Sequence, residues 1–175
     1  MNTRLRIALI ALMLTCVGAN ARAAGAAACA NPQDMSAVRA AAVQQQLMVA
    51  ALSCHAVDQY NKFVLTYRKD LQASDLALQT FFRRLHGQGG TADYHAFKTR
   101  LANTSSMDSI HDIGGFCASA QAAFDVALNE RKASLATFVA GQTTGVDREF
   151  TPCPSQLKPN PSRAKTVVAS KGDSK

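Results

Sequence analysis

Apolar residues in the middle of the chain recur at intervals of three and four, which is the spacing of an α-helix buried along one face. One such stripe follows Asn31 and Pro32, and a second, narrower stripe begins at Tyr60. The first contains Met35, Val38, Ala42, Val49 and Leu52, and the second contains Val64, Tyr67, Leu71, Leu78, Phe81 and Leu85. No stretch alternates apolar and polar residues over the length of a strand, so the pattern predicts an all-α fold.

Glycine and proline mark the expected helix ends. Neither occurs between Gln33 and His86, and the next uninterrupted runs end at Gly114-Gly115 and at Gly141. Glycine often follows the last turn of a helix, whereas Asn31-Pro32 suits the N-cap and the first position of one. The spacing predicts a single four- to five-helix bundle over residues 24–154, which is long enough to bury one core.

The region between residues 33 and 86 is expected to fold back on itself. As one helix it would be about 80 Å long, whereas a compact body of this size is only about 36 Å across. The two apolar stripes are also one residue out of phase, which predicts a bend near residues 54–58. Asp58 is a candidate cap for the helix after the bend, and Ser74-Asp75 is a further candidate break.

Later helices are expected from similar signals. A third helix begins at Thr91, and Ser105 with Asp108 resembles a capping box for a short helix that follows. A last helix is predicted from Phe116 to about Ala140. Nearly all of the chain's aromatic residues lie in these helical segments, mostly on the apolar stripes, so we expect them to form core rather than a ligand surface.

The N-terminus has the pattern of a secretory signal peptide over residues 1–23. Arg4 and Arg6 precede the apolar run Ile7–Val17, and Ala21-Arg22-Ala23 fits a cleavage site before Ala24. The run is too short to span a bilayer as a mature helix, so no transmembrane segment is expected after cleavage. The signal predicts a periplasmic or secreted protein.

A lipoprotein signal with Cys16 as the acylated residue is the rival interpretation. Thr15, which precedes it, is a poor match to the small residue usually found there. We therefore favour simple export.

The positive charge of the protein is concentrated at its C-terminus. The formal net charge is +7 for the full chain, and it is zero over residues 24–150. Residues 155–175 hold five Lys or Arg and a single Asp, with little to bury, which predicts a disordered basic tail. Nucleic acid is not an expected partner, because binding it needs a basic patch on a folded face. Weak contact of the tail with anionic surfaces is an option, although a solvated tail is the simpler expectation.

Four cysteines remain after the predicted cleavage: Cys29, Cys54, Cys117 and Cys153. In an oxidising compartment they imply two disulfides, and their wide spacing lacks the close pairs typical of a zinc site. Three pairings are possible. We favour Cys54–Cys117, beside the apolar stripes, together with Cys29–Cys153 at the two ends of the bundle.

Cys54, His55 and Asp58 form the one local cluster of side chains that could act in catalysis or metal binding. A half-cystine has no free thiolate, so Cys54 would be neither nucleophile nor metal ligand. His55 and Asp58, three residues apart, share a face only if the helix continues through them. They remain weak candidates, because no metal, nucleotide or hydrolase motif accompanies them and no cofactor is expected.

A resemblance covers roughly residues 44–128. The runs that carry it are QQQLMVAALSCHAVDQYNKFV, LQASDLALQTFFRR, ADYHAFKTRLAN and GGFCASAQAAF. Together they resemble a family of exported helical proteins from alphaproteobacteria that has no assigned activity. The resemblance implies an exported, helical, disulfide-bearing protein and carries no catalytic residue.

The function expected from these observations is binding or structural interaction in the cell envelope, without catalysis and with an unknown partner. The alternative is a metal-binding protein or enzyme whose site is assembled from separate helices, with His55 and Asp58 as its weak candidates.

Overall fold

The computed structural model describes residues 29–129 and 133–154. These residues form six α-helices and two short 3₁₀ helices and contain no strand: α3 (Pro32–Ser53), α4 (Val57–Thr66), α5 (Arg68–His86), η1 (Gly87–Gly89), α6 (Gly90–His111), α7 (Ile113–Ala127), α8 (Leu135–Ala140) and η2 (Gly145–Arg148). The predicted all-α bundle is confirmed, with five helices of ten or more residues and the six-residue α8. The predicted signal peptide, with Cys16, and the predicted basic tail lie outside the described residues.

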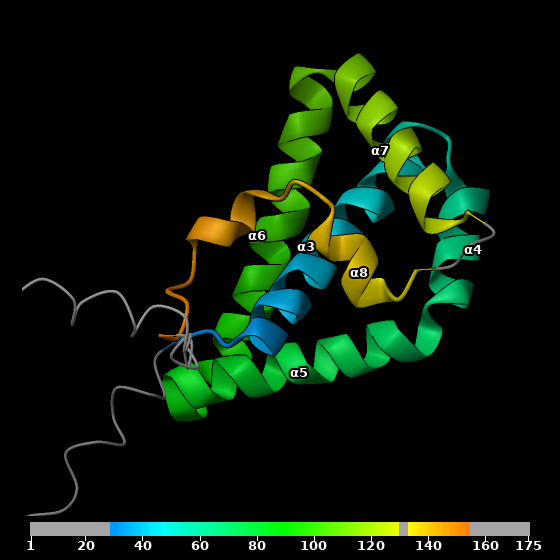
Figure 1. Ribbon diagram of the computed structural model, residues 1–175. Coiled ribbons are helices and arrows are strands. Elements are labelled where there is room, and N and C mark those ends of the chain that lie inside the picture. The colour runs from blue at the N-terminus through cyan, green and yellow to red at the C-terminus, as the bar shows by residue number, and fades with distance from the viewer. Residues whose placement is uncertain (1–28, 130–132, 155–175) are drawn as a thin grey trace, which may run out of the picture.

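The helix α3 is the centre of the bundle. It contacts α4, α5, α6, α7, α8 and η2, and Figure 1 shows it enclosed by the long helices, with α5 along the bottom of the view and α6 on the left. Its buried side includes the small residues Ala37, Ala40, Ala41, Ala50 and Ala51. Small side chains let neighbouring helices approach closely on several sides. None of the described helices is long and apolar enough to span a membrane.

The beginning of α3 agrees with the prediction. Asn31 is the N-cap, and its side chain accepts hydrogen bonds from the backbone N–H groups of Gln33 and Asp34 at 2.8 and 2.9 Å. The Asp34 carboxylate accepts in return from the Asn31 N–H at 2.7 Å. This capping box satisfies donors that the first turn of a helix leaves unpaired. Arg84 on α5 also binds Asp34, which joins the two helices.

The predicted bend near residues 54–58 is confirmed, and its geometry explains His55. Cys54 ends α3, and His55 has a φ of 57°, the left-handed conformation that glycine usually supplies at this position. The Ala56 N–H donates to the Ala51 carbonyl at 3.1 Å. This is the bond of a Schellman motif that spans five residues, from the second residue after the cap back to the last turn of the helix. Asp58 is not the cap of α4, contrary to our expectation, because the turn places Ala56 at the N-cap and Asp58 inside the first turn.

The second break lies at Tyr67, and the prediction of a break at Ser74-Asp75 is wrong. Ser74 and Asp75 are interior residues of α5. Tyr67 is 4 % exposed, and its hydroxyl donates to the Ala127 carbonyl at 2.9 Å and to the Ala133 carbonyl at 3.2 Å. These tertiary hydrogen bonds hold the tyrosine at the junction of α4 and α5, and local sequence does not reveal them.

The expected capping box at Ser105 and Asp108 is absent, because α6 continues through both residues to His111. Ser105 is buried, 8 % exposed, instead of facing solvent at a helix start. The turn comes later, at Asp112, whose carboxylate accepts from the Gly115 N–H at 2.9 Å and caps α7.

The single last helix expected over residues 116–140 is also wrong. It consists of α7, which ends at Ala127, and α8, which begins after the N-cap Ser134. The side chain of Ser134 accepts from the Thr137 N–H at 3.2 Å. The break lets α8 fold back onto α3, so that Leu135 and Phe138 enter the core.

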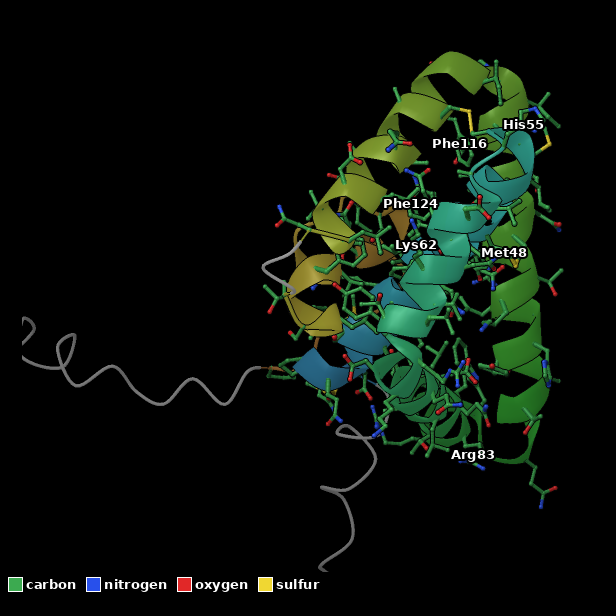
Figure 2. All side chains as sticks on the ribbon, turned by 90° about the vertical axis from the view of Figure 1, so that its right-hand side faces the viewer. Met48, His55, Lys62, Arg83, Phe116 and Phe124 are labelled. Atoms are coloured by element: carbon green, nitrogen blue, oxygen red, sulfur yellow. A yellow bond between two sulfur atoms is a disulfide. The ribbon has the colours of Figure 1, made fainter. Side chains whose placement is uncertain are left out.

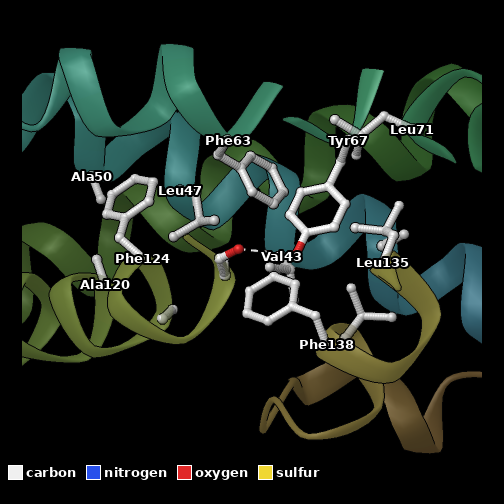
Figure 3. Close-up of a cluster of buried hydrophobic side chains, with 14 of the residues drawn as sticks. Val43, Leu47, Ala50, Phe63, Tyr67, Leu71, Ala120, Phe124, Leu135 and Phe138 are labelled. Atoms are coloured by element: carbon white, nitrogen blue, oxygen red, sulfur yellow. Dashed lines mark hydrogen bonds between the residues drawn. The ribbon is translucent and has the colours of Figure 1, made fainter. Parts of the chain in front are cut away.

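The core consists of two apolar clusters. The first, drawn in Figure 3, lies between α3, α4, α7 and α8, and we call it the Phe63 cluster. Its larger members are Val43, Leu47, Val49, Phe63, Tyr67, Leu71, Phe116, Phe124, Leu135, Phe138 and Val139. The Phe97 cluster lies between α3, α5, α6 and the segment after α8. Leu52, expected on the buried stripe of α3, is 73 % exposed, because the last turn of α3 is not covered on that side.

Both favoured disulfides are present. Cys54–Cys117 joins the end of α3 to α7, and Cys29–Cys153 joins the two ends of the described chain. Beside the second, the Ala30 N–H donates to the Thr151 carbonyl and the Cys153 N–H to the Ala30 carbonyl, both at 2.9 Å. The chain ends are therefore held covalently and by backbone hydrogen bonds.

Candidate functional site

The candidates His55 and Asp58 do not form a site. Both side chains are exposed, and in the part of the chain that the structure describes no hydrogen bond or ion pair joins them. The helix does not continue from one to the other, so their spacing no longer places them on one face. Figure 2 shows His55 near Phe116, at the opposite end of the molecule from Arg83. Cys54 is disulfide-bonded.

The predicted metal-binding alternative also lacks a set of ligands among the described residues. Within residues 29–129 and 133–154, no group of three or more His, Cys, Asp or Glu side chains is placed to hold an ion. His86 lies 3.5 Å from a carboxylate oxygen of Asp93, as an exposed pair next to η1.

A polar groove between α5 and α6 is the better candidate. It has a volume of about 620 Å³, which is within the range of small-molecule sites. One face of α5 supplies most of its lining, with side chains spaced by three and four residues: Arg68, Leu71, Gln72, Asp75, Leu76 and Gln79. Tyr94 and Lys98, one turn apart on α6, face them, and α3 and α4 add Gln44 and Val64. We call this the α5–α6 groove.

Asp75 is the centre of a hydrogen-bond network in this groove. One carboxylate oxygen accepts from the Tyr94 hydroxyl at 2.6 Å and from the Lys98 ammonium at 3.0 Å. The other oxygen accepts from the Gln79 side-chain amide at 2.9 Å. The Lys98 Nζ also lies 5.7 Å from the centre of the Tyr94 ring, close enough for a cation–π contact. The network joins α5 to α6 and fixes four polar side chains on one surface.

The network also sets the protonation of its members. Burial raises the pKa of Asp75, but the hydrogen bonds from Tyr94, Lys98 and Gln79 and the charge of Lys98 outweigh it, so the pKa falls below its ordinary value. Burial, together with the hydrogen bond to Asp75 and the charge of Asp75, raises the pKa of Tyr94 to about 12. At neutral pH the carboxyl is ionised and the phenol is protonated. Both pKa values lie far from neutrality, which suits binding better than general acid–base catalysis.

Cationic donors exceed the acceptors that are still free in the groove. Arg68 has no hydrogen bond or ion pair with any described residue, and Lys98 has spent one of its three donors on Asp75. The carboxylate of Asp75 is already bonded through both oxygens. The groove therefore has a net positive charge.

Sequence reasoning missed this groove. The positions Arg68, Gln72, Asp75 and Gln79 repeat at intervals of four, three and four beside the apolar stripe, and this was the available signal. A polar face of that kind usually belongs to a solvated helix, so the pattern alone does not indicate a site. The crossing of α5 and α6 turns this polar face into one wall of a groove, because it places Tyr94 opposite Asp75.

Comparison of the chain with protein-family models, curated proteins and solved structures found no significant match. The resemblance to exported alphaproteobacterial proteins thus remains a prediction, and no function is carried over from a relative.

Proposed function

We propose that this protein is an exported, non-catalytic binding protein of the cell envelope and that the α5–α6 groove is its ligand site. The observation that carries the proposal is the Asp75 network, which fixes polar groups on the surface of a groove of about 620 Å³. Side chains held in place before the ligand arrives lose less conformational entropy on binding, which favours affinity.

The location in the cell envelope is supported by two features. The leader has the charge and hydrophobicity pattern of an export signal, and both disulfides are typical of an oxidising compartment such as the periplasm or the cell exterior. A thiol titration of the exported protein under denaturing conditions should find no free cysteine. Two or more free thiols would contradict the export proposal.

The groove is tested by nuclear magnetic resonance. We expect small-molecule extracts of the cell envelope to shift the side-chain amide resonances of Gln72 and Gln79 in the ¹⁵N-labelled protein, because both line the groove. A Gln72→Trp variant places a large ring in the groove and should abolish the shift of the remaining reporter, the Gln79 amide. Gln121→Trp is the matched control, since Gln121 is an exposed residue of α7 outside the groove. Extracts that shift neither amide would contradict a ligand site here.

A further inference from the structure

We propose that the ligand of the α5–α6 groove is a small organic anion: a carboxylate or a phosphate monoester with an apolar body. This inference rests on the proposed function and adds the chemical class of the ligand. It follows from three properties of the groove, namely its free cationic donors, its occupied acceptors and its apolar lining.

The charge of the groove favours an anion. Arg68 offers five N–H donors in a planar fork that matches a carboxylate or phosphate, and no described residue accepts from them. Lys98 offers two further donors beyond its bond to Asp75. Charge-assisted hydrogen bonds of this kind are stronger than those between neutral groups.

The occupied acceptors disfavour a cation. Among the described residues that line the groove, Asp75 is the only carboxylate, and its oxygens already accept from three donors. A bound cation would have to displace Lys98 or Tyr94, and it would be repelled by Lys98 and Arg68. A neutral ligand would fit the space but would leave the guanidinium without a charged partner.

The apolar part of the lining predicts an apolar body on the ligand. Leu71 is 7 % exposed and Val64 is partly buried, and Tyr94 adds an aromatic ring to the same lining. Leu76 is 60 % exposed, so it offers apolar surface to a ligand in the groove. An aliphatic chain or a ring on the ligand would cover this leucine and remove its apolar surface from water.

Matched pairs of small molecules test the class. Hexanoate and hexyl phosphate are the anionic probes, and hexanamide and hexanol are the neutral probes with the same apolar body. Binding is followed through the side-chain amides of Gln72 and Gln79 by nuclear magnetic resonance. We expect the anions to bind at millimolar concentrations or below, at least about tenfold more tightly than their neutral partners. Free inorganic phosphate should bind more weakly than hexyl phosphate, because it lacks the apolar body.

Adjacent residues of α5 provide the variant and its control. Arg68→Gln should weaken hexanoate binding by about tenfold. Lys69→Gln removes the same charge one residue away, where the side chain does not line the groove, and should change binding less than about twofold. Equal losses in the two variants would show that general attraction, not the groove, binds the anion, and would overturn the inference.

The probes also separate this inference from the proposed function. If hexanamide and hexanol shift the Gln72 and Gln79 amides as strongly as the anions do, the groove binds ligands but the anion class is wrong. If no probe and no envelope extract shifts them, the proposed ligand site itself is wrong.

Discussion

The two apolar clusters are built from different parts of the chain. The Phe63 cluster combines α3 from Ala40 onward with α4, the start of α5, α7 and α8. The Phe97 cluster combines the start of α3 with the C-terminal half of α5, with α6, and with Val146 and Phe150 after α8. α3 contributes to both clusters, so its N-terminal and C-terminal halves largely pack against different helices.

The clusters are also packed differently. In the Phe97 cluster the ring of Phe150 lies 5.1 Å from that of Phe81, 5.9 Å from that of Phe82 and 5.8 Å from that of Phe97. The Phe63 cluster has more aliphatic and alanine side chains and one buried polar anchor, the Tyr67 hydroxyl, whose hydrogen bond is dashed in Figure 3.

Ion pairs accompany the Phe97 cluster. Within the described residues, four Arg or Lys ion pairs join helices or the η2 region: Arg84–Asp34, Arg39–Asp147, Arg100–Glu149 and Lys98–Asp75. The Phe97 cluster is thus reinforced by ion pairs between helices, by rings in edge-to-face contact and by the Cys29–Cys153 disulfide beside Ala30. The Phe63 cluster is reinforced by the buried Tyr67 hydroxyl and by the Cys54–Cys117 disulfide.

The largest expected effect comes from the disulfides. Removing Cys29–Cys153, which spans 124 residues, should lower the free energy of unfolding by about 5 kcal/mol in the chain-entropy model. Removing Cys54–Cys117, which spans 63 residues, should lower it by about 4 kcal/mol. Denaturant unfolding of the two Cys→Ser double variants measures which disulfide contributes more to the free energy of unfolding. A greater loss for Cys54–Cys117 would contradict the chain-entropy model, in which the longer closed loop gives the larger stabilisation.

The next effect concerns the close approach of α5 and α6 beside the Phe97 cluster. A Cβ at Gly90 would lie 2.5 Å from the Phe82 carbonyl oxygen and 2.6 Å from the Arg83 Cα, both backbone atoms that cannot move aside alone. Gly90→Ala should therefore destabilise the protein by about 1–3 kcal/mol. Gly145→Ala, with nothing within 4 Å of the added carbon, is the control and should change stability by less than about 0.5 kcal/mol. Similar melting temperatures for both variants would disprove the tight crossing.

A smaller effect belongs to the polar anchor of the Phe63 cluster. Tyr67→Phe keeps the ring and removes the hydroxyl, which leaves the Ala127 carbonyl without that hydrogen bond. The expected loss is about 1 kcal/mol, measured by denaturant unfolding. Tyr60→Phe, at the partly buried edge of the same cluster, serves as the comparison. If the loss at Tyr67 is no greater than at Tyr60, the hydroxyl does not hold the junction of α4 and α5.

The smallest expected effect on stability comes from the Asp75 network, which lies between the two clusters. It joins Tyr94 of the Phe97 cluster to α5, whose Leu71 belongs to the Phe63 cluster. The pKa of Asp75 is lowered in the folded protein, so its contribution is present above the unfolded pKa and is lost as pH falls through the folded pKa. Asp75→Asn should therefore flatten the acid side of the stability profile. Asp58→Asn, at an exposed carboxyl, is the control. Identical acid limbs in the wild type and Asp75→Asn would contradict the network's role.

At alkaline pH the same network gives the opposite pH dependence of stability, through Tyr94. The pKa of Tyr94 is raised to about 12, so the stabilisation from its protonated form is complete below the unfolded pKa near 10 and is lost as pH rises through about 12. In Asp75→Asn the phenol should titrate at lower pH, because the carboxylate no longer accepts its hydrogen bond. Ultraviolet absorbance of tyrosinate follows this shift, and an unchanged titration would contradict the coupling.

The sequence by itself determined the helical class, the N-cap of α3 at Asn31 and the bend after Cys54, because caps and apolar periodicity act over a few residues. It favoured one of three possible disulfide pairings, and the structure decided among them. Only the tertiary structure decided that α4 ends at Thr66, before Tyr67, that α6 runs through Ser105 and that α7 and α8 are separate. Each of those boundaries depends on a contact with a distant helix. The α5–α6 groove follows the same rule: Asp75 and Tyr94 are 19 residues apart, and only the crossing of two helices brings them together.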